Sequence, residues 1–225
     1  MPNGTTRFSG YLEPEEVRSI INAIPQVSKY PERDQLLAEL LWQSGARVTE
    51  AITLVPERIG MTSVILINLK QSKPLKGPDG KVLRDENQRP VRVKDENAIK
   101  EVEISQDLCQ RLKDFCVNIS IGEWIFQNKN PLQHVSRWYI WDLITRASEQ
   151  ARIFRFGKRH IRTGGRFKGA FPHLFRHSSA MYMLEETDNI MIVQQQLGHA
   201  DVKTTQSYAY VKKKQVKKAI SKIKW

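Results

Sequence analysis

The sequence predicts a mainly α-helical fold with one small antiparallel β-sheet, of the α+β class. Apolar residues recur every three or four positions over most of the chain, which is typical of helices that bury one face. The run 61–69 is instead β-branched and apolar, and the run 99–104 alternates, so both indicate strands. Of the 225 residues, 40% are hydrophobic, which suffices for an ordinary core. No repeat or change of composition divides the chain, so we expect a single domain over 1–225.

Two helices are predicted in the first part of the chain, after a polar lead-in at 1–11. Pro14 and the acids beside it open the first helix, because negative charge is favourable at the N-terminal end of the helix dipole. Its apolar spacing ends at Pro25. The second helix begins near Pro31 and ends at Ser44–Gly45, since glycine readily takes the left-handed conformation of a helix C-terminus.

An insert at 74–100 separates the two predicted strands and is dense in proline, glycine and charge. In one interpretation 81–83 and 91–93 form a hairpin around Asp85–Asn87. In the other, the whole insert is a loop without regular structure.

Two further helices are predicted in the middle of the chain. One starts at Asp107 and carries a short apolar stripe. The other is the longest in the sequence, from Gln133 to Ile153. Its residues Trp138, Trp141 and Ile144 follow one another at three-residue steps, so we expect all three to face the core.

Shorter helices are predicted toward the C-terminus. Pro172 suits the first position of a helix, where a missing N–H costs nothing. Asp188 is expected to cap the next helix and Gly198 to end it, and Asp201 to cap a third. The segment 212–225 has the pattern of a basic amphipathic helix.

The charge of the chain indicates a polyanionic partner. The net charge is +12 and the isoelectric point about 9.8, so nucleic acid is the first hypothesis; an acidic membrane surface or simple solubility are the alternatives. From 150 to 184 there is no acidic residue, and glycines stand between the basic ones. Such a connector can follow a phosphate backbone closely, although a solvated loop is the alternative. The expected DNA contacts are Arg155, Lys158, Arg159, Arg162, Arg166 and Lys168.

Other classes of protein fit the sequence poorly. Cys109 and Cys116 have no cysteine or histidine partner at zinc-ligand spacing, so we expect them to pack in the core. Two cysteines make no disulfide scaffold, which fits a reducing cytosol. No apolar run reaches membrane-spanning length and no secretory signal is visible, so the prediction is a cytoplasmic protein, associated with the nucleoid.

Several residues are suited to bind a phosphate. Arg47 and Glu50 lie three apart and share one face of a helical turn, as do His173 and Arg176. Each pair has an ordinary explanation when it is taken alone. Arg47 and Glu50 would form a surface ion pair, and His173 would be a structural histidine. The stretch 189–210 also has the look of a helix-turn-helix, which reads DNA without chemistry.

Together these residues closely resemble the two signature boxes of the tyrosine recombinases, the phage-integrase family. The resemblance covers about 12–211, and the order Arg, Lys, His-x-x-Arg, His, Tyr is complete. The first box is Ser44-Gly45-Ala46-Arg47-Val48-Thr49-Glu50, Lys70-Gln71-Ser72-Lys73 resembles the hairpin that carries the family's lysine, and the second box comprises His173-x-x-Arg176-His177, Leu197-Gly198-His199 and Thr204-Thr205-x-x-Tyr208.

The resemblance implies a catalytic set and its chemistry. Arg47 and Arg176 would offer planar paired donors to the non-bridging phosphate oxygens, where negative charge grows during attack. Tyr208 would attack phosphorus and form a covalent 3′-phosphotyrosine without metal, cofactor or ATP, and Tyr210 is its rival. The other implied roles are His173 as base, His199 as hydrogen-bond donor to the phosphate, Lys73 (with Lys70 and Lys76 as rivals) as the acid for the leaving 5′-oxygen, and Glu50 as the carboxylate that orients Arg47.

Double-stranded DNA is the implied partner, with self-association on paired sites through the tail 212–225. The alternatives are a type IB topoisomerase-like relaxase and a DNA-binding regulator without activity. Many family members also carry an N-terminal helical domain that clamps DNA, for which this sequence has no room. We therefore expect the catalytic part of a longer protein or a minimal member. The insert 74–100 is longer than usual, and it adds a contact to DNA, a contact to a partner, or nothing.

Overall fold

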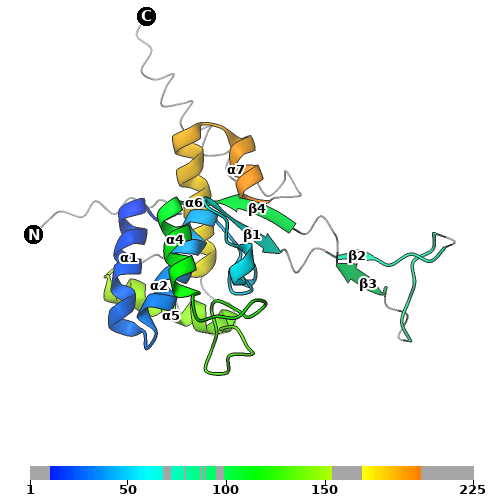
Figure 1. Ribbon diagram of the computed structural model, residues 1–225. Coiled ribbons are helices and arrows are strands. Elements are labelled where there is room, and N and C mark those ends of the chain that lie inside the picture. The colour runs from blue at the N-terminus through cyan, green and yellow to red at the C-terminus, as the bar shows by residue number, and fades with distance from the viewer. Residues whose placement is uncertain are drawn as a thin grey trace, which may run out of the picture.

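The structure, a computed structural model, describes residues 11–67, 72–78, 80–86, 88, 90–94, 99–153 and 169–198. Within these ranges the chain is mainly helical and its strands form short antiparallel ladders, which confirms the predicted fold class (Figure 1). The elements are α1 (Pro14–Val27), α2 (Pro31–Ser44), α3 (Val48–Ala51), a 3-10 turn η1 (Pro56–Arg58), β1 (Ser63–Ile67), β2 (Ser72–Pro74), β3 (Arg92–Lys94), β4 (Ile99–Glu103), α4 (Gln106–Phe115), α5 (Arg137–Gln150), α6 (Pro172–Thr187) and α7 (Ile190–Leu197).

Helices α1 and α2 pack against each other and supply much of the core. The prediction that α1 ends at Pro25 is wrong, because the helix continues to Val27. Proline has no N–H to donate to the carbonyl four residues earlier, which is that of Ile21. The side-chain amide of Gln35 on α2 donates to this carbonyl at 3.3 Å. A side chain of the neighbouring helix therefore takes the place of the missing backbone bond.

Helix α2 ends at Gly45, as the sequence predicts, in the left-handed conformation with φ of +58°. A side chain would be strained there and would also collide with α7. An added Cβ would lie 2.4 Å from Cδ2 of Leu197. Gly45 thus lets the ends of α2 and α7 touch, and this contact joins the first half of the chain to the last described residues.

The small sheet consists of β1 and β4, which pair antiparallel with Leu66 opposite Lys100. Leu66 and Val102 are buried, so one face of this sheet belongs to the core. The side chain of Gln196 on α7 bonds to the backbone of β4 at Glu103, where its amide donates to the carbonyl at 2.6 Å and its oxygen accepts from the N–H at 3.2 Å. This bond pair attaches α7 to the edge of the sheet.

The insert contains a second ladder, β2–β3, in which Lys73 lies opposite Val93. Further along, an antiparallel bridge joins Arg84 to Pro90. The chain thus turns back around Asp85 and Val91 bonds to Leu83, but the expected pairing of 81–83 with 91–93 is otherwise wrong, because Val82 bridges Lys76 and Val93 pairs with Lys73. The alternative of a loop without structure is also wrong for the described part of the insert. Figure 1 shows the β2–β3 ladder standing away from the helices.

Helix α5 begins at Arg137, later than the predicted Gln133. Ser136 caps it, since its hydroxyl accepts the N–H of Tyr139 at 3.0 Å. The expectation that Trp138 faces the core is wrong, because this side chain is 71% exposed. The core-facing stripe instead consists of Ile140, Leu143, Ile144 and Ala147, with Trp141 half-buried beside it.

Helices α6 and α7 follow each other closely. Pro172 opens α6, as predicted. The cap of α7 is Asn189, whose side chain accepts the N–H of Met191 at 2.9 Å, so the prediction of Asp188 as the cap is wrong. Asp188 instead ends α6 in the left-handed region, with φ of +48°, which aspartate tolerates better than most residues. Gly198 ends α7 in the same conformation, as predicted.

Cys109 and Cys116 are buried free thiols, which confirms the expectation of core packing. Burial raises the pKa of Cys109, and it raises the pKa of Cys116 to about 11, so both thiols stay protonated near neutrality. In the described ranges, no three His, Cys, Asp or Glu side chains gather closely enough to hold a metal ion. None of the described helices combines the length and apolar character needed to cross a bilayer.

Candidate active site

Four charged side chains from three distant parts of the sequence meet at the edge of the core. We call them the arginine–lysine cluster: Arg47, Glu50, Lys100 and Arg176. Arg47 immediately precedes α3 and Glu50 lies on it, as their spacing predicts, while the other two come from β4 and α6. The cluster therefore forms only when the two halves of the chain fold against each other.

Glu50 is the centre of the cluster and is only 1% exposed, so it does not belong to a surface ion pair. Its Oε1 accepts from Nη1 of Arg47 at 2.8 Å. Its Oε2 accepts from the backbone N–H of Arg47 at 3.0 Å and lies 3.1 Å from Nζ of Lys100. Burial alone raises the pKa of Glu50, but Lys100 and the hydrogen bonds from Arg47 outweigh it and hold this pKa below its usual value. The carboxylate is thus charged and fixes the Arg47 side chain.

Lys100 is the member of the cluster that the sequence analysis missed. Its ammonium group binds Glu50 and also donates to the carbonyl of Leu197 at 3.1 Å. Burial lowers the pKa of Lys100, Glu50 opposes that shift, and the nearby Arg176 and Arg47 lower the pKa further. A signal for it exists in the sequence: Lys100 is two residues before Val102 and shares the inward face of β4, where a lysine is out of place unless it is paired.

Arg176 is 7% exposed and holds two backbone segments together. Its Nη1 donates to the carbonyl of Gly45, and its Nη2 donates to the carbonyl of Leu197 at 3.1 Å. Lys100 donates to the same Leu197 carbonyl, so two cations meet the C-terminal end of α7, where the helix dipole favours positive charge. An added Cβ on Gly198 would lie 2.6 Å from Cδ of Lys100. The residue before His199 is therefore fixed by the cluster.

Among the described residues, the cluster has more positive than negative charge. Arg47, Lys100 and Arg176 supply three cations, and Glu50 supplies one carboxylate. A desolvated site with such an imbalance costs free energy, and it is relieved by binding an anion. The Arg47 side chain is 30% exposed, so an anion can reach the cluster from solvent.

His173 lies on the first turn of α6, one turn before Arg176, and is exposed. It lines a hollow of about 580 Å³, which we call the His173 hollow. This hollow extends over the exposed Trp138 at the start of α5. The sequence predicted that His173 and Arg176 share a face, and the structure places them one turn apart on α6, with His173 exposed and Arg176 buried. The remaining lining residues are Val48, Ser136, Arg137, Trp141, Phe171 and Pro172.

Other predicted site residues are not brought into the cluster by the described part of the structure. Lys73 belongs to β2, in the ladder that stands apart, and its side chain lies outside the description. Lys76 is exposed in the insert. Further predicted residues lie outside the described ranges: Lys70, His199, Tyr208 and Tyr210, the expected DNA contacts Arg155, Lys158, Arg159, Arg162, Arg166 and Lys168, and the tail 212–225.

The sequence matches the family model described as "Phage integrase family" over residues 10–215. This chain belongs to the phage integrase family. The match includes the cluster residues and both signature boxes, so the resemblance drawn from short motifs extends to nearly the whole chain.

Curated relatives and solved structures agree with this assignment. The chain is 28% identical over 204 residues to the tyrosine recombinase XerD of Corynebacterium glutamicum, covering 89% of this chain and 56% of that protein. It is 26% identical over 218 residues to the XerD of Staphylococcus epidermidis, covering 96% and 63%. The XerH site-specific recombinase bound to difH substrate has the same fold, with a TM-score of 0.62, 17% identity, and coverage of 93% of this chain and 52% of that one. The chain thus spans somewhat more than half the length of the curated relatives it matches.

Proposed function

We propose that this chain forms the catalytic region of a site-specific DNA recombinase, which cleaves and rejoins DNA through a 3′-phosphotyrosine on Tyr208. The observation that carries the proposal is the arginine–lysine cluster in a member of the phage integrase family: Arg47 and Lys100 pair with one buried carboxylate, and Arg176 shares the Leu197 carbonyl with Lys100. The XerD relatives are tyrosine recombinases, and the XerH structure holds a DNA substrate.

In this proposal the scissile phosphate is an anion bound by the cations of the cluster. Arg47 and Arg176 donate to its non-bridging oxygens, whose negative charge grows as the nucleophile approaches. Guanidinium groups suit this task because they stay charged and offer paired, planar donors. Glu50 and Lys100 act as positioning residues, since they bind Arg47 and the end of α7 and so pre-set the site before DNA arrives.

The chemical step exchanges one ester for another. The Tyr208 hydroxyl oxygen bonds to phosphorus while its proton passes to His173, and His199 donates a hydrogen bond to the phosphate. The bond from phosphorus to the 5′-oxygen breaks, and Lys73 protonates that oxygen to give a free 5′-hydroxyl. Attack by a 5′-hydroxyl of another strand reverses the step and rejoins the DNA. The phosphotyrosine conserves the energy of the cleaved linkage, so the scheme needs no ATP.

The partner in this proposal is double-stranded DNA, which places the protein at the nucleoid. In the proposal, the basic connector contacts the phosphate backbone of this DNA through Arg155, Lys158, Arg159, Arg162, Arg166 and Lys168. The tail 212–225 mediates assembly on paired sites, because its apolar positions have the pattern of a docking helix.

A covalent trap tests the nucleophile. Duplexes are made from inverted repeats in the DNA flanking the gene, with a nick that releases a short fragment after cleavage. Incubation in EDTA is expected to give a covalent protein–DNA adduct, visible as a shifted band on a denaturing gel. Tyr208→Phe should give none, because phenylalanine has no oxygen to attack phosphorus.

Tyr210→Phe is the matched control and should trap DNA like the unmodified protein. Equal trapping by Tyr208→Phe would overturn the assignment of the nucleophile. Tight DNA binding without any adduct, with Tyr208 intact, would favour the DNA-binding regulator instead.

A further inference from the structure

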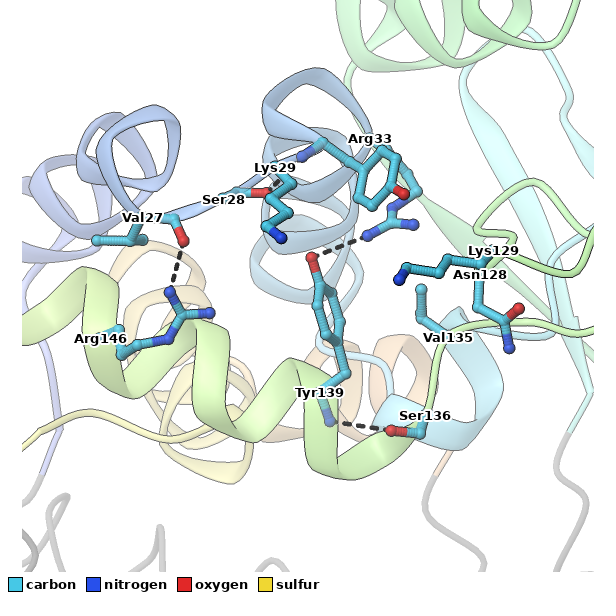
Figure 2. A pocket seen from close by; sticks show the side chains of 11 residues that line it. Val27, Ser28, Lys29, Arg33, Asn128, Lys129, Val135, Ser136, Tyr139 and Arg146 are labelled. Atoms are coloured by element: carbon cyan, nitrogen blue, oxygen red, sulfur yellow. Dashed lines mark hydrogen bonds between the residues drawn. The ribbon is translucent and has the colours of Figure 1, made fainter.

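A second hollow, of about 390 Å³, opens between the turn joining α1 to α2, the segment 128–136 and one face of α5 (Figure 2). We call it the basic hollow. Four of its lining side chains are cationic and none is acidic; the cations are Lys29, Arg33, Lys129 and Arg146.

Arg33 is balanced by a carboxylate beneath the hollow. Its Nε and Nη2 donate to Oδ1 of Asp34 at 2.8 and 2.7 Å, and Nη2 also donates to the hydroxyl of Tyr139 at 2.9 Å. The other carboxylate oxygen of Asp34, which is fully buried, accepts from the hydroxyls of Tyr139 and Ser28. Arg33, Asp34, Tyr139 and Ser28 therefore form a neutral hydrogen-bonded network that joins the elements lining the hollow.

The two lysines are placed differently. Both are exposed, and no hydrogen bond or ion pair with another described residue engages either ammonium group. Figure 2 shows them on either side of the Tyr139 side chain. Arg146 stands at the far wall, where it donates to Asp142 at 2.8 Å and to the carbonyl of Val27. The positive charge that is open to a ligand thus belongs mainly to Lys29 and Lys129.

The basic hollow adjoins the His173 hollow. Ser136 lines both this hollow and the His173 hollow, so the two meet at the start of α5. A duplex bound at the arginine–lysine cluster carries one phosphate per about 3.4 Å of axis on each strand, so neighbouring phosphates pass along the surface on both sides of the scissile one. A basic recess next to the His173 hollow is suited to receive one of them.

We propose that the basic hollow binds a phosphate group through Lys29 and Lys129. Two ammonium groups facing one recess can both donate to one phosphate, either the singly charged phosphodiester of DNA or a free phosphate dianion. The hydroxyl of Ser136, which lines both hollows, offers a further polar contact. The source is either the DNA backbone, which rests on the proposed function, or a free phosphate. Such a contact fixes the register of the duplex on the protein and carries no base specificity.

The test measures how salt affects DNA binding. Fluorescence anisotropy gives the Kd of the full chain for a 30-base-pair duplex from the flanking repeats, over a range of salt concentrations. All proteins carry Tyr208→Phe, so that binding is read without cleavage. The variant is Lys29→Gln with Lys129→Gln, and Lys29→Arg with Lys129→Arg keeps the charge. Arg18→Gln with Lys113→Gln is the matched control, because it removes two positive charges on α1 and α4, outside both hollows.

If the ligand is a DNA phosphate, the glutamine pair should lower the steepness of log K against log salt by about 0.9 for each lost contact. It should weaken binding to the specific duplex and to an unrelated duplex equally. The arginine pair and the remote control should keep the original slope. For a free phosphate, titration with inorganic phosphate should shift the NMR signals around Ser136 in the parent but not in the glutamine pair, with the slope unchanged. An unchanged slope together with no response to inorganic phosphate would overturn the proposal. The covalent trap is a separate assay, so a failure of the recombinase proposal leaves this result readable.

Discussion

The arginine–lysine cluster and the network of Arg33, Asp34 and Tyr139 are both built around a buried carboxylate that accepts from a guanidinium. In the Arg33 network, one cation faces one carboxylate, and hydroxyl groups complete the bonding. In the cluster, Arg47 and Lys100 share Glu50, and Arg176 beside them donates to backbone carbonyls. The first network is balanced by its own residues, whereas the second has more cations than carboxylates within the described part of the chain.

This difference separates a structural network from a functional one in the same core. A neutral buried ion pair is tolerated when all its hydrogen bonds are made, and it can then join secondary-structure elements without binding a ligand. Surplus charge lowers stability and is retained where it serves binding or catalysis. Mutations in the two networks should accordingly differ in whether they affect folding or chemistry.

The largest effect is expected from Asp34→Asn. Asparagine keeps the shape but leaves the buried guanidinium of Arg33 without its counter-charge. Removing one partner of a buried pair costs about 3–5 kcal/mol, so the free energy of unfolding should fall by that order in urea denaturation. The adduct yield per folded molecule should fall far less than in Arg47→Lys. A loss of chemistry at unchanged stability would contradict the structural role.

The next effect concerns Arg47→Lys. Lysine keeps the charge but loses the paired donors, and the partly exposed position should limit the cost to folding. Removing one donor to a developing oxyanion typically costs about 10²–10³-fold in rate, so covalent trapping should slow by that factor. Arg111→Lys is the control, since Arg111 on α4 also pairs with a carboxylate, donating from its guanidinium to both oxygens of Glu39 on α2. Equal slowing in both variants would contradict a role for Arg47 at the phosphate.

The smallest effect is the pH dependence due to Glu50. Its pKa is held below the usual value, so between its folded and unfolded pKa values the unfolded chain binds more protons. The stabilisation is therefore present above about pH 4.3, the ordinary glutamate value, and is lost as pH falls through the folded pKa. Urea denaturation of Glu50→Gln and the unmodified protein should give stabilities that converge as pH falls below that point. Glu149→Gln, on the exposed end of α5, is the control for the effect of net charge. A difference in stability between Glu50→Gln and the unmodified protein that stays constant with pH would contradict the prediction.

Local patterns accounted for much of the fold. The helix ends at Gly45 and Gly198 follow from glycine's freedom in the left-handed region, and the inward face of β4 follows from its alternation. The errors have physical reasons as well. Pro25 lies within α1 because Gln35 from another helix bonds the orphan carbonyl, and periodicity alone gave no sign that α5 starts only after Ser136, which leaves Trp138 on the surface.

The candidate site shows the same division. The sequence by itself determined the family and the paired spacings of Arg47 with Glu50 and His173 with Arg176, since helical geometry places residues three apart on one face. Tertiary structure alone decided that Lys100 joins Glu50 and that Arg176 and Lys100 share the Leu197 carbonyl. These contacts depend on how β4, α6 and α7 pack, and packing joins positions whose separation along the chain carries no periodic signal.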